Sequence, residues 1–166
     1  RTDLFDEEFL AFPDGSKLKA GHALWLAWDP TWLYRLLFKR MANGDELLLR
    51  YLRDECGLDL VRHAILGWLP GEDEAAHRRV IETMVGRYMG SGPNKGSSYN
   101  WVPNHLQDAN GMGSPRSVLK LFSKAAELQR ADSSTTTLLT PSSLQGALMD
   151  TSEERIHELG EEYPWI

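Results

Sequence analysis

The stretch Ser114-Pro-Arg-Ser-Val-Leu-Lys-Leu-Phe-Ser-Lys-Ala-Ala-Glu-Leu128 gives the clearest structural signal in the chain. Ser114 suits the N-cap of a helix, and Pro115 suits the first helical position, where its missing N–H costs nothing. Apolar residues then recur at helical spacing, at Val118, Leu119, Leu121, Phe122, Ala125 and Leu128. The stretch therefore predicts an amphipathic helix that begins at Pro115.

Asp29-Pro30 repeats this pairing of a cap residue with a proline. We expect the helix that follows it to stop at Asn43-Gly44. Its predicted inner face consists of Leu33, Leu36, Leu37 and Met41. A second helix is expected from about Asp45 to Glu55, ended by Gly57, with an inner face made of Leu47, Leu48, Tyr51 and Leu52.

Further helices are expected in the middle and at the end of the chain. Glu72-Asp-Glu74 places negative charge at the start of a helix that runs to about Met89, where this charge meets the helix dipole favourably. Near the C-terminus, Thr140-Pro141 predicts a short helix over 141–149. Thr151-x-x-Glu154 offers a capping box for another over 152–161.

One segment reads as a strand. His22-Ala-Leu-Trp-Leu-Ala-Trp28 is short and apolar, and it is bounded by Gly21 and by Asp29-Pro30. A single strand needs a sheet to join, so it either pairs with another copy or is buried under helices. A homo-oligomer is therefore one of the two expected arrangements.

Composition limits the function classes. The 166 residues include 42% hydrophobic residues and six tryptophans, which is ample for a packed core. A net charge of -6 argues against a general nucleic-acid surface, because phosphate binding depends on clustered lysine and arginine. The single Cys56 excludes an intrachain disulfide and fits a reducing cytoplasm. There is no run of eighteen apolar residues and no export leader, although a leader upstream of Arg1 stays open.

Direct chemical signals are weak. The loop over 90–98 has the composition of a phosphate-binding loop, but it reads Lys95-Gly96 where the motif has Gly-Lys, and a predicted helix precedes it. His105 and Asp108 could be two metal ligands on one helical face, but an internal hydrogen bond or a helix cap explains them better. Cys56 has no evident histidine partner, so we interpret it as buried and inert. No catalytic residue and no metal site is predicted.

Four stretches, in this order, resemble the C-terminal part of bacterial P-loop ATPases of the signal-transduction and KAP-like type. They are Arg1-Thr-Asp-Leu-Phe5; Phe12-Pro-Asp-Gly-Ser-Lys-Leu18 with Leu24-x-Leu-x-Trp28; Trp101-Val-Pro-Asn-His-Leu106 with Ser114-Pro-Arg-Ser117; and Pro141-Ser-Ser-Leu144 through Ser152-x-x-Arg155-x-x-Glu158-Leu159 to Glu162-Tyr-Pro-Trp165. The chain departs from an intact family member because it contains no G-x-x-x-x-G-K-[ST] loop and no acidic magnesium-binding strand.

The resemblance implies a mainly α fold: a helical lid bundle with a winged-helix-like C-terminal part, and one short strand left from an α/β P-loop sheet. Residues 1–44 would be the remnant of the nucleotide-binding sheet, 45–98 the helical lid and 99–166 the winged-helix-like region. On this reading the chain is the second part of a larger protein.

The same resemblance implies a regulatory role that couples nucleotide state to partner contacts, without complete catalysis by the chain alone. ATP with magnesium would be held by an upstream nucleotide-binding region, Arg116 would reach toward a phosphate, and Arg1 and Asp3 would lie near the nucleotide. Two alternatives stay open. They are a stand-alone winged-helix module that binds protein, or less readily DNA, and a small hydrolase that uses His105 and Asp108.

Overall fold

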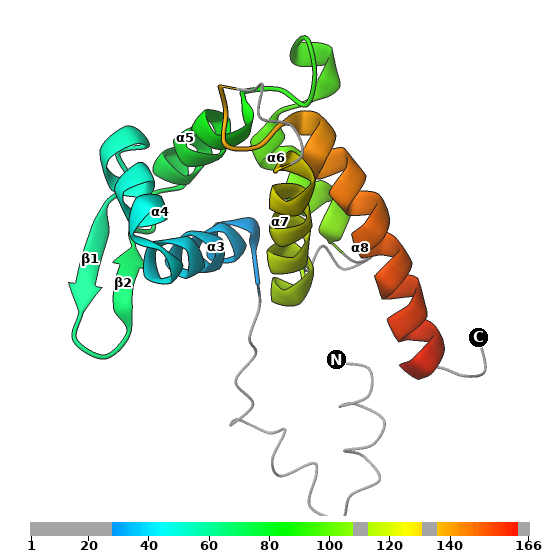
Figure 1. Cartoon of the computed structure of the whole chain (residues 1–166), viewed down its shortest axis with the longest axis horizontal. Coiled ribbons are helices and arrows are strands. Elements are labelled where there is room, and N and C mark those ends of the chain that lie inside the picture. Colours follow the sequence, from blue (N-terminus) through cyan, green and yellow to red (C-terminus); the bar gives the residue numbers. More distant parts are fainter. Residues whose placement is uncertain (1–27, 108–112, 131–135, 163–166) are drawn as a thin grey trace, which may run out of the picture.

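The computed structural model describes residues 28–107, 113–130 and 136–162, with side chains in the last range as far as Glu153. Its elements are the helices α3 (Pro30–Gly44), α4 (Glu46–Arg50), α5 (Glu74–Val85), α6 (Ser98–Leu106), α7 (Pro115–Gln129) and α8 (Pro141–Glu162), and the strands β1 (Leu60–His63) and β2 (Gly67–Pro70) (Figure 1). The described part is thus mainly helical with one small antiparallel sheet, as the coarse prediction of an α fold required. The predicted strand over 22–28 lies outside the described residues except for Trp28.

Helix α3 begins where the sequence predicts. The Asp29 carboxylate accepts the Trp32 N–H at 2.9 Å, and Pro30 occupies the first turn. The buried face consists of Leu33, Tyr34, Leu37, Phe38 and Ala42. Leu36 and Met41, predicted to face inward, are only partly buried, because the two aromatic side chains take the central positions.

Helix α4 continues directly into a π-helical turn over Tyr51–Glu55, and Gly57, with φ of 64°, ends the segment. Leu49 and Leu52 are buried, whereas Leu47 is 72% exposed, so its predicted inward position is wrong. Three consecutive leucines fit more than one helical face. The face that packs is the one that continues to Leu52 and Cys56.

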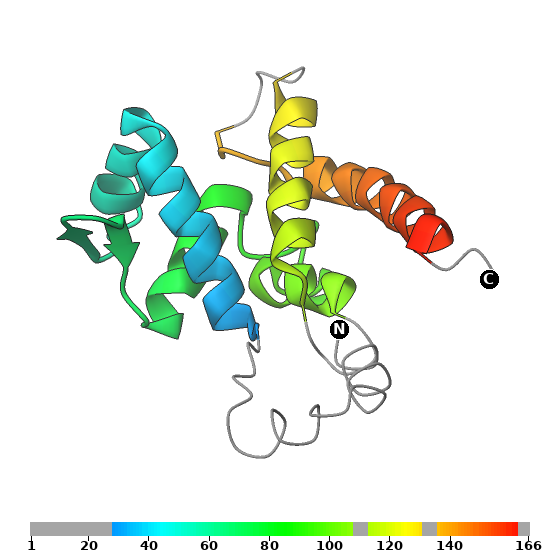
Figure 2. The same ribbon diagram turned by 90° about the horizontal axis from the view of Figure 1, so that it is seen from below.

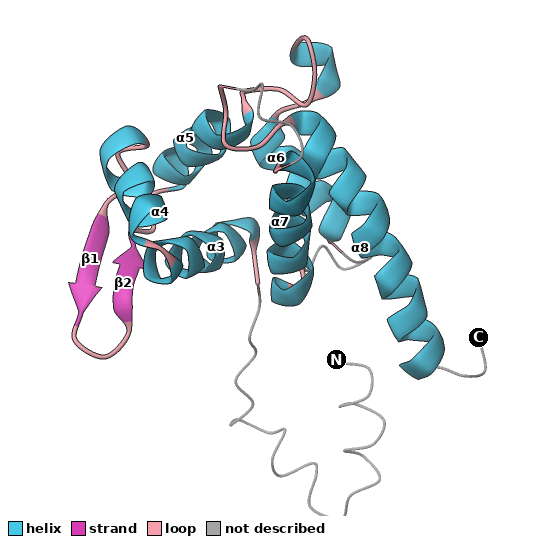
Figure 3. Ribbon diagram, viewed as in Figure 1, coloured by secondary structure: helices cyan, strands magenta, loops and turns pink. Residues whose placement is uncertain are grey.

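Strands β1 and β2 form an antiparallel hairpin in which Leu60 pairs with Pro70 and His63 with Gly67 (Figure 3). Asn43, near the end of α3, attaches this hairpin to the helix. Its side-chain oxygen accepts the Trp68 N–H at 2.8 Å, and its Nδ2 donates to the Trp68 carbonyl at 2.9 Å. Gly67 has φ of 72°, and a Cβ there would collide with the Asn43 side chain. Only glycine meets both conditions.

Helix α5 is capped by Asp73, whose carboxylate accepts the Ala75 and Ala76 N–H groups at 3.0 and 3.2 Å. It ends before Gly86, which has φ of 103°, so the predicted extension to Met89 is wrong. Beyond Gly86 the chain forms a loop in which Met89 N–H donates to the Gly96 carbonyl at 3.0 Å. The 90–98 segment is therefore tied back on itself between two helices.

Helix α8 runs without a break over Pro141–Glu162, where two short helices were predicted. The Thr151 hydroxyl donates to the Ala147 carbonyl at 2.7 Å, so this side chain bonds within the helix and caps no new one. The first half of α8 packs against α7, whereas the rest diverges from it (Figures 1 and 2).

The described residues of 99–166 form α6, α7 and α8, and the two named strands lie instead within the predicted lid, 45–98. The winged-helix character and the proposed domain boundaries therefore stay predictions. Of the described helices, none has both the length and the apolar composition that crossing a membrane requires.

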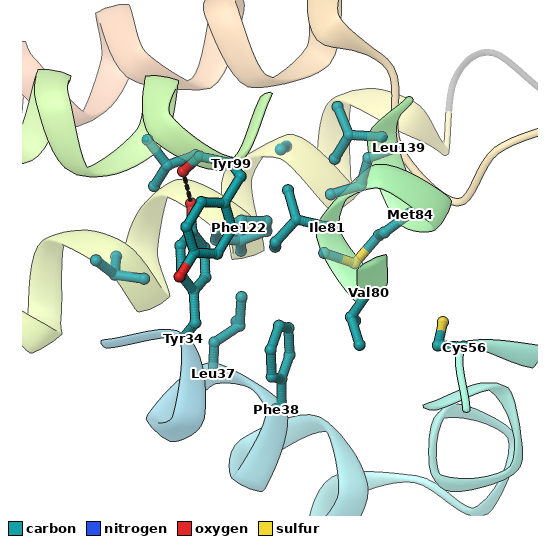
Figure 4. Packing of buried hydrophobic residues seen from close by; sticks show 14 of the residues in the cluster. Tyr34, Leu37, Phe38, Cys56, Val80, Ile81, Met84, Tyr99, Phe122 and Leu139 are labelled. Atoms are coloured by element: carbon teal, nitrogen blue, oxygen red, sulfur yellow. Dashed lines mark hydrogen bonds between the residues drawn. The ribbon is translucent and has the colours of Figure 1, made fainter. Parts of the chain in front are cut away.

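The core lies between α3, α5, α6 and α7 (Figure 4). The Tyr34 hydroxyl donates to the Tyr99 carbonyl at 2.5 Å, and the two rings stack with centroids 4.7 Å apart. Phe38, Ile81 and Leu121 are fully buried around them. Buried residues from all three predicted segments thus belong to one cluster.

We predict that His77 makes stability depend on pH. It is fully buried, with Nε2 2.9 Å from the Gly71 carbonyl oxygen, and burial lowers its pKa below the ordinary 6.5. The unfolded chain therefore binds a proton more readily, so this contribution to stability is complete above about pH 6.5 and is lost as the pH falls below it. Urea unfolding of the wild type and of His77→Gln, followed by circular dichroism from pH 8 to 5, measures it. A wild-type slope equal to that of the variant would contradict it.

We predict that Asn43→Ala loosens the hairpin. The change removes both bonds to Trp68, at a cost of about 1–3 kcal/mol of unfolding free energy. Hydrogen exchange should show faster exchange of the β1 and β2 amides, with the amides of α7 less affected. Asn94→Ala, on an exposed loop, is the control. Unchanged protection at Trp68 would rule out the attachment.

Candidate functional site

Helix α7 starts at the predicted position but without the predicted side-chain cap. Pro115 takes the first turn, and Val118 N–H donates to the Ser114 carbonyl at 3.2 Å. The Ser114 side chain forms no capping hydrogen bond. Val118, Leu121, Phe122 and Ala125 are buried as expected, whereas Leu128 is 44% exposed. The apolar stripe is therefore covered only as far as Ala125, since the last turn of α7 lies at the edge of the core.

Arg116, predicted to approach a phosphate, is exposed in the first turn of α7. No acidic residue accompanies it in that turn. The positive end of a helix dipole disfavours a cation there by about 0.3–1 kcal/mol at low ionic strength, and it favours an anion. Arg1 and Asp3, the other two predicted nucleotide-binding residues, lie outside the described residues, so their distance from Arg116 is untested.

An open groove of about 640 Å³ borders α7. Its walls are Leu37 and Met41 of α3 and Leu119, Phe122 and Ala126 of α7, with Leu138 and Leu139 beside them. The groove is thus mostly apolar. The same helix that carries Arg116 in its first turn supplies one wall of the groove with its later turns.

Two arginines, Arg40 of α3 and Arg130 after α7, also line this groove. Several other arginines have charged or aromatic partners: Arg35 pairs with Glu72, for example, and Arg62 lies over the Trp68 ring. Among the described side chains, Arg40 and Arg130 take part in no ion pair, hydrogen bond or ring contact. The groove therefore joins an apolar floor to two unneutralised positive charges.

The other predicted chemistry finds a structural explanation. His105 has its Nδ1 2.7 Å from the Trp101 carbonyl and stacks on the Trp101 ring, and its predicted companion Asp108 lies outside the described residues. Within the described ranges, no three histidine, cysteine, aspartate or glutamate side chains gather as metal ligands. Cys56 is buried, which confirms that part of the expectation, and burial raises the pKa of its thiol. Burial also raises the pKa of Tyr99 to about 12, so both groups stay protonated near neutral pH.

A scan against models of protein families, a search of curated proteins and a search of solved structures found no match to this chain. The site is therefore interpreted from its own residues.

Sequence reasoning identified Arg116 and its place in a first helical turn, because the cap-and-proline signal is local. It missed the groove, whose residues come from α3, α4, α5, α7 and the segment before α8. The nearest signal was the pair of basic residues Lys39-Arg40 beside apolar helical positions. That pattern does not reveal which element faces it.

We predict that the groove binds an anionic aromatic dye such as anilinonaphthalene sulfonate, which matches an apolar floor with two arginines. Ala126→Trp fills the groove from its edge and should weaken dye binding at least about tenfold. Glu127→Trp, the next residue on α7 and not part of the lining, is the matched control. Fluorescence titration under native conditions measures both. Equal binding by the two variants would place the dye elsewhere.

Proposed function

We propose that this chain is the lid and C-terminal regulatory region of a P-loop ATPase, in which α7 couples nucleotide state to contacts with a partner. The observation that carries the proposal is that one helix, α7, carries both Arg116 and part of the groove wall. Its first turn presents Arg116, and its later turns, at Leu119, Phe122 and Ala126, line the groove. A helix of 15 residues spans about 22 Å, so one rigid element joins the two sites.

The environment of Arg116 supports the nucleotide half of the proposal. A guanidinium beside the free N–H groups of a first helical turn can hold a phosphate oxygen, and the positive end of the helix dipole favours an anion there. Because the 166 residues contain no phosphate-loop signature, ATP and magnesium would be held by the upstream nucleotide-binding region. Arg116 would then sense the γ-phosphate, with Arg1 and Asp3 near the nucleotide.

Movement of α7 would link the two halves. A phosphate that binds Arg116 would shift the first turn of α7. Because the helix is rigid, Leu119 and Phe122 would shift with it. Because Leu37 and Met41 belong to α3, a shift of α7 against α3 changes the width of the groove. Partner affinity would then follow nucleotide state, as coupling between two sites requires.

The hairpin favours one alternative, a winged-helix-like module that binds protein. Val61, Ile65 and Leu66 near its tip are 59%, 87% and 52% exposed, which is the kind of surface that protein partners cover. DNA binding is less favoured, because the net charge is -6. A gel shift with duplex DNA that weakens as salt rises would shift the weight to a nucleic-acid role.

We predict that the isolated chain binds MgATP weakly or not at all, as measured by calorimetry. A Kd in the micromolar range would contradict the proposal that the upstream region, and not this chain, holds the nucleotide.

We predict that Arg116→Ala lowers kcat for ATP hydrolysis by the chain joined to its upstream nucleotide-binding region by at least about tenfold, because an arginine that meets the transferred phosphate stabilises the transition state. Arg116→Lys should retain part of the activity. Arg79→Ala, an exposed arginine of α5, is the control and should leave kcat unchanged. Wild-type kcat and KM in Arg116→Ala would refute the sensing role.

A further inference from the structure

We propose that the groove between α3 and α7 binds the distal half of α8, residues 150–162, from a second copy of this chain. In the proposed function, α7 contacts a partner, and this inference identifies that partner as a second copy of the chain. Its regulatory role therefore rests on the proposed function. The binding itself requires no nucleotide.

The groove sets the requirements for its occupant. An apolar floor with Leu37, Leu119 and Phe122 calls for an apolar stripe on the bound segment. Arg40 and Arg130, which lack partners among the described side chains, call for carboxylates beside that stripe. An acidic amphipathic helix that lies between two helices meets both requirements.

The distal half of α8 has this composition. Between positions 150 and 162 its acidic residues are Asp150, Glu153, Glu154, Glu158, Glu161 and Glu162. Arg155 is the only lysine or arginine in the same span. The segment is thus strongly negative, opposite in sign to the arginines of the groove.

Its apolar residues are also spaced for a groove. In the sequence, Ile156 and Leu159 follow Met149, which directly precedes the segment, at intervals of seven and three residues, a spacing that returns to the same helical face. Met149 is 69% exposed, so this side is not covered at the start of the segment.

The arrangement of the helices favours exchange between two copies. The groove lies on the α3 side of α7, whereas α8 lies on the opposite side and diverges from α7 in both views (Figures 1 and 2). The distal half of α8 therefore points away from the groove of its own chain. Two copies related by a twofold axis would each supply one groove and one helix, which closes the assembly as a dimer.

Sedimentation velocity without nucleotide tests the inference with two complementary variants. The groove variant is Arg40→Glu with Arg130→Glu, and the helix variant is Glu154→Lys, Glu158→Lys and Glu161→Lys. Each alone opposes like charges, so its dimer Kd should rise at least about tenfold over that of the wild type. An equimolar mixture restores opposite charges at both grooves and should form a dimer again.

Arg53→Glu with Arg79→Glu changes the net charge as much as the groove variant and should dimerise like the wild type. A wild-type chain that stays monomeric to about 100 µM would overturn the inference. So would a groove variant that dimerises normally, or a mixture that stays monomeric, because either result places the contact elsewhere. None of these results bears on Arg116. The proposed role of Arg116 in nucleotide sensing is tested separately, by the kcat of ATP hydrolysis in Arg116→Ala.

Discussion

The hydrogen bond from Tyr34 to the Tyr99 carbonyl is the constraint on which the rest of the structure depends. Tyr34 is 1% exposed, and a buried hydroxyl without a partner costs about 1–3 kcal/mol, so α3 and α6 are held where this bond can form. Toward its other end, α3 is tied to the hairpin through Asn43 and Trp68. Fixed near both ends, α3 gives α5 and α7 a rigid surface to pack against, and it gives the groove one fixed wall.

The opposite wall, α7, is placed differently. Its buried stripe at Val118, Leu121 and Ala125 anchors it in the core, while its first and last turns lie at the surface. The charges at these two surfaces have separate physical consequences. The first turn of a helix favours a nearby anion, whereas the two arginines of the groove are exposed and favour carboxylates on an occupant that lies beside them. Because Arg40 and Arg130 have no partner among the described side chains, the groove favours an occupant that carries negative charge.

Local signals made the helix starts predictable, and contacts between distant segments limited the rest. Asp29 and Thr140 cap their helices through bonds three residues ahead, to Trp32 N–H and Ser143 N–H, so a short stretch suffices to locate both. The outward position of Leu47 and the presence of the hairpin depend on contacts with other elements: Asn43, for example, bonds to Trp68, 25 positions away. The continuity of α8 could not be predicted because the Thr151 hydroxyl can either cap a new helix or bond within the existing one. In the structure it donates to the Ala147 carbonyl, so the helix continues. Of the site, the first-turn position of Arg116 was predictable from sequence, and the groove was not.

The contact between Asn43 and Gly67 has a consequence for how this sequence can change over evolution. A side chain at Gly67 needs both the removal of Asn43 and a backbone conformation that L-residues rarely adopt. Loss of Asn43 alone causes no steric conflict, because Gly67 has no side chain. We therefore expect substitutions in related chains to occur at Asn43 first and at Gly67 only afterwards. A chain with asparagine at position 43 and a residue other than glycine at position 67 should not be found.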